Sequence, residues 1–250
     1  MDLALKGKRA LVTGATSGLG AVIARALAAE GVSVAIGGRD RGRGDASVQA
    51  ICNAGGTAVP ALGDLATDSG ADACFSGAKE ALGGIDILIN AMGYSPGIGR
   101  LQPDGSWAEA YRTLTLPGVR MVHRISPGMK EAGWGRIIQI GSADALTPAA
   151  VPQAYASAKA AVANMSLGLA KAFAGTGITV NTISPGLAAT PAYAEEDENA
   201  LIERHGRQSV NGIVPLDGIA AMAVWLASPL AGHVSGANIR IDGGFSPAIN

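Results

Sequence analysis

Three residues of this sequence could together transfer a proton at an alcohol or carbonyl group. Tyr155 and Lys159 are four positions apart, which places both side chains on one face of a helix. A phenol has a pKa of about 10, and a neighbouring ammonium lowers that pKa because it stabilises the phenolate. Ser142 lies shortly before them and could donate a hydrogen bond to a reacting carbonyl oxygen. We therefore predict that Ser142, Tyr155 and Lys159 are catalytic.

A glycine-rich turn near the N-terminus could bind the phosphates of a dinucleotide. It has the spacing GxxxGxG, follows an apolar run and opens an amphipathic segment. Glycines let backbone amides approach a pyrophosphate at a helix N-terminus, where the helix dipole favours an anion. Such turns also occur for packing alone, and the position after the first strand favours the cofactor. The expected cofactor contacts are Gly14, Thr16, Ser17, Gly18, Leu19 and Gly20.

The end of the second apolar run predicts which cofactor is used. NAD enzymes commonly carry an acid there that binds the adenosine ribose, whereas this chain has Gly38 followed by Arg39. A guanidinium can form a bidentate pair with a 2′-phosphate. Asp40 could instead neutralise Arg39 as a surface pair. We expect NADP(H), with NAD(H) as the alternative.

The elements that must position these residues alternate along the chain. Short runs rich in Val, Ile and Leu alternate with Ala-rich amphipathic segments, which is typical of βαβ units around a buried parallel sheet. We expect strands at Arg9–Thr13, Ser33–Gly37, Thr57–Ala61, Asp86–Asn90, Arg136–Gly141, Thr179–Ile183 and Asn238–Ile241. Helices are expected at Gly18–Ala29, Gly42–Ala54, Asp68–Leu82, Trp107–Glu131, Gln153–Ala174 and Leu216–Ala227. The fold class is α/β, a single doubly wound Rossmann-type domain over residues 1–250 with about seven parallel strands and helices on both faces.

One long segment, residues 186–215, escapes this alternation. Connections of such length inside a compact domain are commonly functional lids, and we expect a substrate lid there. A solvated surface helix is the alternative, since the segment carries the acidic run Glu195–Glu198.

Composition narrows the class of function. The chain is 48% hydrophobic with a net charge of −1, and no basic stripe suggests a nucleic-acid partner. No apolar run is long enough to span a membrane, and the N-terminus lacks the features of a signal peptide. Two isolated cysteines and three scattered histidines suggest no metal site. We expect a cytoplasmic protein without a metal.

The motifs in this order resemble the short-chain dehydrogenase/reductase family over essentially the whole chain, and 3-oxoacyl-(acyl carrier protein) reductases among its members. The matching pieces are Thr13–Gly20, Asp64-Leu65, Asn90-Ala91-Met92-Gly93, Ser142, Tyr155 with Lys159, Asn181, Pro185-Gly186 and Asp242-Gly243-Gly244.

The resemblance implies roles for these positions. Tyr155 would exchange the proton, Lys159 would bind the nicotinamide ribose and tune the tyrosine, and Ser142 would orient the carbonyl. The further cofactor contacts it implies are Asp64, Leu65, Asn90, Ala91, Gly93, Pro185, Gly186, Leu187 and Thr190. It also implies a homo-oligomer, a tetramer or dimer paired through the two helices expected at Trp107–Glu131 and Gln153–Ala174.

The sequence also departs from the family pattern. The family's fourth catalytic residue is an Asn, and the matching position here is Leu114, which cannot hold a relay water. Pro117 lacks an N–H for the carbonyl of Thr113, and that carbonyl could bind the water instead; a simple helix bend is the alternative. Ala91 and Met92 replace the family's second Asn and its Ala, and the segment before the last helix also differs from the usual start.

Residues near the carboxyl ends of strands are candidates for the substrate, because ligands bind beside such ends. These are Tyr94, Ser95, Asp144 and Leu146, together with Tyr193 in the expected lid. We expect a cytosolic ketone or 3-oxoacyl reductase, reversible as an alcohol dehydrogenase, with a small carbonyl or alcohol substrate in an apolar pocket. The alternative is a nucleotide-binding homologue with weak or lost turnover that acts as a partner subunit or sensor, which Leu114 favours and the intact Ser142, Tyr155 and Lys159 oppose.

Overall fold

Buried apolar strands form the centre of the protein. The computed structural model describes residues 1–93, 104–147, 153–190, 197–205 and 212–246. Within these residues a seven-stranded parallel sheet has the order β3-β2-β1-β4-β5-β6-β7. The strands are β1 (Arg9–Thr13), β2 (Ser33–Gly38), β3 (Thr57–Leu62), β4 (Ile87–Asn90), β5 (Gly135–Ile140), β6 (Ile178–Pro185) and β7 (Asn238–Ile241).

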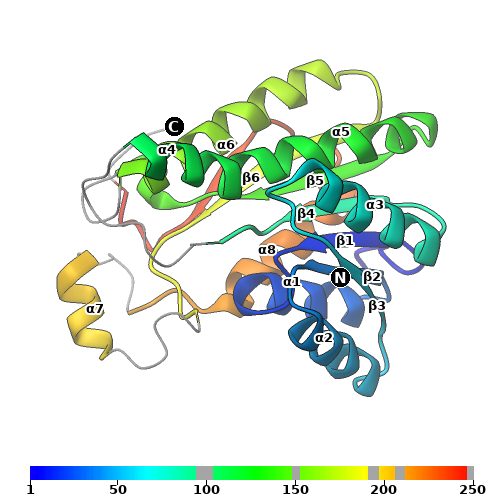
Figure 1. Ribbon diagram of the computed structural model, residues 1–250, viewed down its shortest axis with the longest axis horizontal. Coiled ribbons are helices and arrows are strands. Elements are labelled where there is room, and N and C mark those ends of the chain that lie inside the picture. Colours follow the sequence, from blue (N-terminus) through cyan, green and yellow to red (C-terminus); the bar gives the residue numbers. More distant parts are fainter. Residues whose placement is uncertain (94–103, 148–152, 191–196, 206–211, 247–250) are drawn as a thin grey trace.

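Helices cover both faces of the sheet (Figure 1). The helices are α1 (Gly18–Ala29), α2 (Arg41–Asn53), α3 (Asp68–Leu82), α4 (Asp104–Ala110), α5 (Leu116–Glu131), α6 (Gln153–Ala172), α7 (Glu198–His205) and α8 (Leu216–Ala227). α1, α2 and α8 lie on one face and α3, α5 and α6 on the other, whereas α7 projects from the carboxyl-terminal edge of the sheet. The expected doubly wound α/β architecture is confirmed.

Two apolar clusters hold these layers together. Successive side chains of a strand point to opposite faces, so Val12 packs toward α1 and α8 while Leu11 packs toward α3 and α5. Ile89 and Leu88 of β4 divide between the same two clusters. Each fully buried aliphatic side chain contributes about 1.5–3 kcal/mol, and the sheet is therefore a rigid platform for residues at its edge.

The strand order reverses between β1 and β4, which lie side by side although β2 and β3 separate them in sequence. Connections leave these two strands toward opposite faces, and ligands bind beside the carboxyl ends of strands at such a point. Thr13 pairs with Asn90 in this register. Side chains from β1, β4 and β5 are thereby brought to one edge of the sheet.

The expected continuous helix Trp107–Glu131 is wrong in one respect. A π-helical turn, η1 (Tyr111–Thr115), separates α4 from α5, and the amide of Leu116 donates to the carbonyl of Tyr111, five residues earlier. Pro117 follows this turn as the second residue of α5, and the helical run continues without a break from Asp104 to Glu131, so Pro117 lies inside it as expected. π-helical turns are rare and frequent at functional sites.

Within the expected lid, the chain from Glu198 to His205 is helical as α7. This agrees with the alternative of a helix in this segment, although Leu201 in it is buried. Strand β6 continues to Pro185 rather than ending at Ile183, because Ser184 and Pro185 still pair with β7. Pro185 is tolerated there because proline at the end of a strand removes no essential ladder bond.

Candidate active site

The glycine-rich turn after β1 is built by close backbone packing. Gly14 has a φ of +66°, and a methyl group on its Cα would lie 2.5 Å from the carbonyl oxygen of Ala91. A methyl group on Gly20 would collide with the carbonyl of Gly14. The turn therefore admits only glycine at both positions, and it lies against the end of β4.

The N-terminus of α1 offers anion-binding groups toward this turn. Ser17 is its N-cap and is exposed, and its side chain makes no capping hydrogen bond. The first amides of a twelve-residue helix lack partners within the helix, and the dipole favours a phosphate there. Gly18, Leu19 and Thr16 complete the turn, with Thr16 packed beside Gly38 of β2.

The end of β2 presents Arg39 to solvent. Asp40 does not neutralise it: its carboxylate caps α2 by accepting from the amide of Arg43 at 2.9 Å and forms an ion pair with that guanidinium at 3.0 Å. This capping bond, aided by the charge of Arg43, holds the pKa of Asp40 below its ordinary value. Asp40 therefore pairs with Arg43 and leaves Arg39 exposed.

The residues expected at the adenine follow β3. Asp64 accepts from the amide of Ala66, and the amide of Gly63 donates to the carbonyl of Gly38, which joins the ends of β3 and β2. Leu65 is buried, and its carbonyl accepts from the guanidinium of Arg120 on α5 at 3.0 Å. Arg120 therefore fixes this loop, and nothing in the sequence motif indicated that contact.

The carboxyl end of β4 carries Asn90, Ala91 and Gly93. The hydroxyl of Thr13 donates to Asn90 Oδ1 at 3.2 Å, and the amide of Ala91 donates to the carbonyl of Thr13. Among the described residues, Asn90 Nδ2 has no hydrogen-bond partner. Asn90 thus ties β1 to β4 where the strand order reverses.

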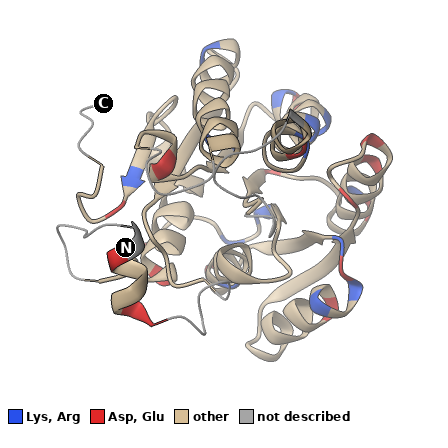
Figure 2. Ribbon diagram, turned by 60° about the vertical axis from the view of Figure 1, so that its left-hand side comes forward, with Lys and Arg blue, Asp and Glu red and all other residues tan. Residues whose placement is uncertain are grey.

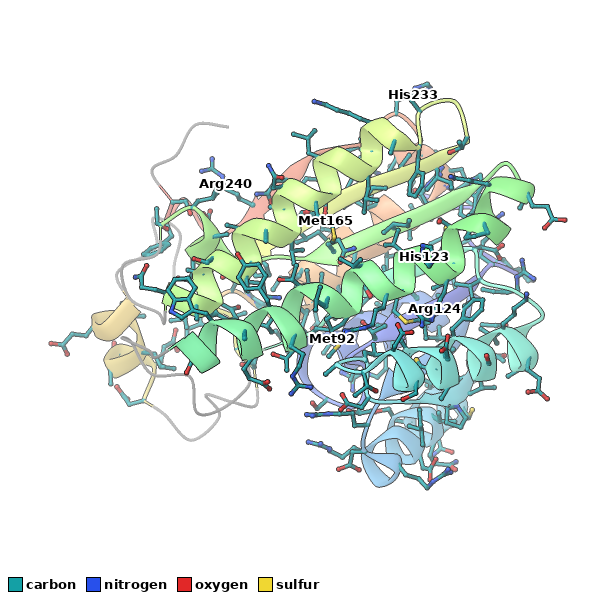
Figure 3. The ribbon with its side chains drawn as sticks, turned by 45° about the horizontal axis from the view of Figure 1, so that its top comes forward. Met92, His123, Arg124, Met165, His233 and Arg240 are labelled. Carbon is teal, nitrogen blue, oxygen red and sulfur yellow. The ribbon has the colours of Figure 1, made fainter. Side chains whose placement is uncertain are left out.

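Lys159 lies buried beside Tyr155 on α6. Its Nζ donates to the carbonyl oxygens of Met92 and Ile140, each at 2.8 Å, and lies 5.9 Å from the centre of the Tyr155 ring. Burial lowers the pKa of Lys159 from its ordinary 10.5 to about 8. In Figure 3, Met92 lies below α5 near the centre of the molecule. The carbonyl of Met92, which follows β4, and the carbonyl of Ile140 in β5 therefore hold the amine at the carboxyl ends of these two strands.

Ser142 follows β5 and is 4% exposed. Its hydroxyl donates to Asp144 Oδ2 at 2.9 Å, and its oxygen accepts from the amide of Asp144 at 3.2 Å. Ser142 thereby caps the short 3-10 helix η2 (Ala143–Ala145). Leu146 follows this helix and is partly exposed, so both substrate candidates after Ser142 lie at the same strand end as the predicted catalytic serine.

The position where the family pattern has Asn is apolar in space as well as in sequence. Leu114 is buried in a cluster with Tyr155, Ala154 and other small residues. Its neighbour Thr115 turns its hydroxyl to the carbonyl of Ala158 at 3.0 Å. The π-helical turn is thus fastened to α6 directly before Lys159, a contact that the sequence did not indicate.

The end of β6 supplies the remaining expected cofactor residues. Pro185 and Gly186 lie next to β7, and the amide of Gly186 donates to the carbonyl of Ile241. Leu187 accepts from the amide of Val214, whose carbonyl accepts from Ala189. This bridge fastens the two ends of the segment that includes α7. Thr190 follows directly, partly exposed.

Three residues expected at the substrate lie outside the described residues: Tyr94, Ser95 and Tyr193. Asn181 is structural, since its side chain bonds the backbone of Val234 and Ala237. Within the described residues, no group of His, Cys, Asp or Glu could hold a metal ion, and none of the helices there is both long and apolar enough to cross a bilayer. Figure 2 shows Lys and Arg interspersed with Asp and Glu.

Comparison with known proteins places this geometry among dehydrogenases and reductases. A family model described as "Enoyl-(Acyl carrier protein) reductase" matches residues 14–246. The chain is 34% identical to the D-beta-hydroxybutyrate dehydrogenase of Cupriavidus necator, over 96% of this chain and 98% of that one. It is 32% identical to 3beta-hydroxysteroid dehydrogenase 1 of Eggerthella lenta, over 97% and 95% of the two chains.

Solved structures show the same likeness. L-sorbose reductase from Gluconobacter frateurii, complexed with NADPH and L-sorbose, superposes with a TM-score of 0.91 at 27% identity and covers 100% of both chains. A 3-oxoacyl-(acyl-carrier protein) reductase from Brucella melitensis also gives a TM-score of 0.91 at 25% identity, over 98% of this chain and 94% of that one.

Proposed function

The chain belongs to the short-chain dehydrogenase/reductase family, and we propose that it transfers a hydride between NADP(H) and a ketone or secondary alcohol. The observation that carries the proposal is the buried amine of Lys159, held by two backbone carbonyls beside Tyr155. Burying an amine is unfavourable without a compensating role, and groups with strongly shifted pKa values cluster at functional sites. A buried lysine beside a tyrosine at the carboxyl ends of two strands is such a group.

The residues present fit a phosphorylated dinucleotide. Gly14 and Gly20 give a turn that a Cβ would fill, Ser17 leaves the N-terminus of α1 open, and Arg39 is exposed at the end of β2. When bound, the nicotinamide supplies or accepts the hydride. Arg39 supports NADP(H) over NAD(H), because Gly38 leaves no carboxylate for ribose hydroxyls. The NADPH in the L-sorbose reductase complex agrees with this choice.

The chain's own groups would move the proton. In the reductive direction the hydroxyl of Tyr155 donates its proton to the carbonyl oxygen as negative charge develops there. Lys159, when protonated, stabilises the resulting phenolate. Ser142 lies at the end of β5, where a hydroxyl could donate to the same oxygen. Because Leu114 is apolar and buried, no side-chain polar atom at that position takes part in returning a proton to Tyr155.

We also propose a homo-oligomer that pairs through α5, α6 and the adjoining π-helical turn. Apolar side chains on these elements remain exposed in the single chain: Tyr111, Leu116, Val119 and Leu167. Covering such a patch in a subunit interface would remove apolar area from water. Light scattering of the purified protein would give the subunit number, with a monomer contradicting this part of the proposal.

The test is NADPH oxidation with a panel of ketones, followed by absorbance. The wild type should consume NADPH with at least one ketone, and Tyr155→Phe should lose about 10²–10⁴-fold in kcat because the general acid is gone. Phenylalanine keeps the ring that packs against Leu114, so the variant should retain NADPH binding. Binding of NADPH without oxidation of it by any ketone would instead support the non-catalytic alternative, a nucleotide-binding partner or sensor.

A further inference from the structure

The predicted carbonyl-orienting serine already has a partner for its proton. Ser142 Oγ donates to Asp144 Oδ2 at 2.9 Å, while the amide of Asp144 donates to the same Oγ at 3.2 Å. A hydroxyl has one proton to donate, and a hydrogen bond to a carboxylate is about twice as strong as one between neutral groups. In this arrangement Ser142 therefore cannot also donate to a substrate carbonyl.

A ketone without other polar groups should bind weakly beside Ser142. Its carbonyl oxygen would have to compete with the Asp144 carboxylate for the Ser142 proton. If it succeeded, it would leave that partly buried carboxylate without the hydrogen bond from Ser142. The carbonyl would then depend on Tyr155 as its hydrogen-bond donor. The structure thus disfavours substrates that have no hydrogen-bond donor for the Asp144 carboxylate.

We propose that Asp144 determines specificity and selects ketones with a hydrogen-bond donor, a hydroxyl or amino group, on a carbon next to the carbonyl. This inference rests on the proposed function. The substrate's donor takes over the carboxylate, and Ser142 turns its proton to the carbonyl oxygen. In the oxidative direction the matching substrate is a vicinal diol or amino alcohol.

The geometry favours adjacent carbons. A carbonyl oxygen bound by Ser142 lies one hydrogen-bond length from Oγ, and Asp144 Oδ2 lies 2.9 Å from the same Oγ. The two substrate oxygens must therefore lie close together, as they do on neighbouring carbons. A carboxylate has about four acceptor positions, so Asp144 can receive a substrate hydroxyl in addition to its present contacts.

The selectivity is best measured with a matched pair of ketones in which one carries a hydroxyl and the other a methyl group at the same carbon. α-Hydroxycyclohexanone and α-methylcyclohexanone differ in this way. A site built to bond a substrate hydroxyl rejects the analogue without it strongly, up to about 10⁴-fold in known cases. For the wild type we expect kcat/KM with NADPH to favour the hydroxy ketone by about 100-fold or more.

The variant Asp144→Ala tests the role of the carboxylate without disturbing the local fold. The capping bond to Ser142 comes from the backbone amide of residue 144, so the 3-10 turn should persist without the side chain. The variant should lose most of its activity on the hydroxy ketone and gain severalfold on the methyl ketone, because Ser142 is released. The preference should fall to within about threefold of unity. Asp144→Asn, which keeps an acceptor, should lie between.

A binding measurement gives a readout that does not depend on turnover. By NMR titration, cyclohexane-diol should bind the wild-type protein more tightly than methylcyclohexanol, and Asp144→Ala should remove the difference. An unchanged kcat/KM ratio and an unchanged binding ratio in Asp144→Ala would overturn the inference while leaving the oxidoreductase proposal intact. Failure of the wild type to oxidise NADPH with either ketone or any other in the panel would overturn the proposed function, and this inference with it.

Discussion

Replacing Lys159 by methionine should remove a pH-dependent loss of stability. The side chain is 2% exposed, and burial lowers its pKa from 10.5 to about 8. A gap of this size corresponds to about 3 kcal/mol in the free energy of unfolding. Methionine has a similar length and carries no charge, so it should fill the same space without the penalty.

The sign follows from which state binds the proton. Above about pH 10.5 the amine is neutral in both states, and burial carries no charge penalty. As the pH falls from 10.5 to about 8, the unfolded chain binds a proton that the folded protein does not, so the wild type loses stability. Below about pH 8 the loss is complete. Methionine leaves the carbonyls of Met92 and Ile140 without their donor. This loss lowers the free energy of unfolding of the variant by about 1 kcal/mol per carbonyl.

The assay is urea unfolding of the cofactor-free protein at several pH values between 7 and 10.5. The free energy of unfolding of Lys159→Met minus that of the wild type should be about 3 kcal/mol more favourable at pH 7 than at pH 10.5. Lys171→Met, at an exposed position on the same helix, controls for general charge effects. A difference that stays constant across this range would refute the reasoning, because Lys159 would then not be buried as an amine with a lowered pKa.

Two further changes test the cofactor site. Arg39→Ala should weaken NADPH binding about 10–100-fold and leave NADH binding nearly unchanged, since only a 2′-phosphate loses a charge-assisted bond; fluorescence titration measures both, and equal losses would remove the case for NADP(H). Gly14→Ala should unfold at a temperature lower by roughly 5 °C or more. A φ of +66° costs about 1–2 kcal/mol for alanine, and the methyl group would press on Ala91. A melting temperature equal to that of the wild type would contradict the described turn.

Much of the fold could be predicted because local patterns determine it. Runs such as Arg9–Thr13 and the amphipathic segment Gly18–Ala29 coincide with β1 and α1, since a buried parallel strand is apolar throughout and a surface helix has one apolar face. The π-helical turn Tyr111–Thr115 could not be predicted. A five-residue turn is too short to reveal itself in the hydrophobic pattern, and the bond from Thr115 to Ala158 that fastens it to α6 joins distant parts of the chain.

The candidate site also has a part that the sequence predicts and a part that it does not. Ser142, Tyr155 and Lys159 are found from type and spacing, and the structure brings Lys159 against the ends of β4 and β5. The partners of Lys159 were not predictable, because they are backbone carbonyls that have no sequence signature. Asp144 was a substrate candidate by its position alone. Its bond to Ser142 is a local turn contact that spacing permits but does not require.

The central claim is hydride transfer at a site where Tyr155 supplies the proton. The most direct test is a single turnover with NADPH that carries deuterium at the transferable position of nicotinamide C4, analysed by mass spectrometry of the product. Deuterium should appear on the carbinol carbon of the alcohol formed by the wild type, and Tyr155→Phe should form no labelled alcohol in the same time. An unlabelled alcohol, or equal labelling by Tyr155→Phe, would contradict it.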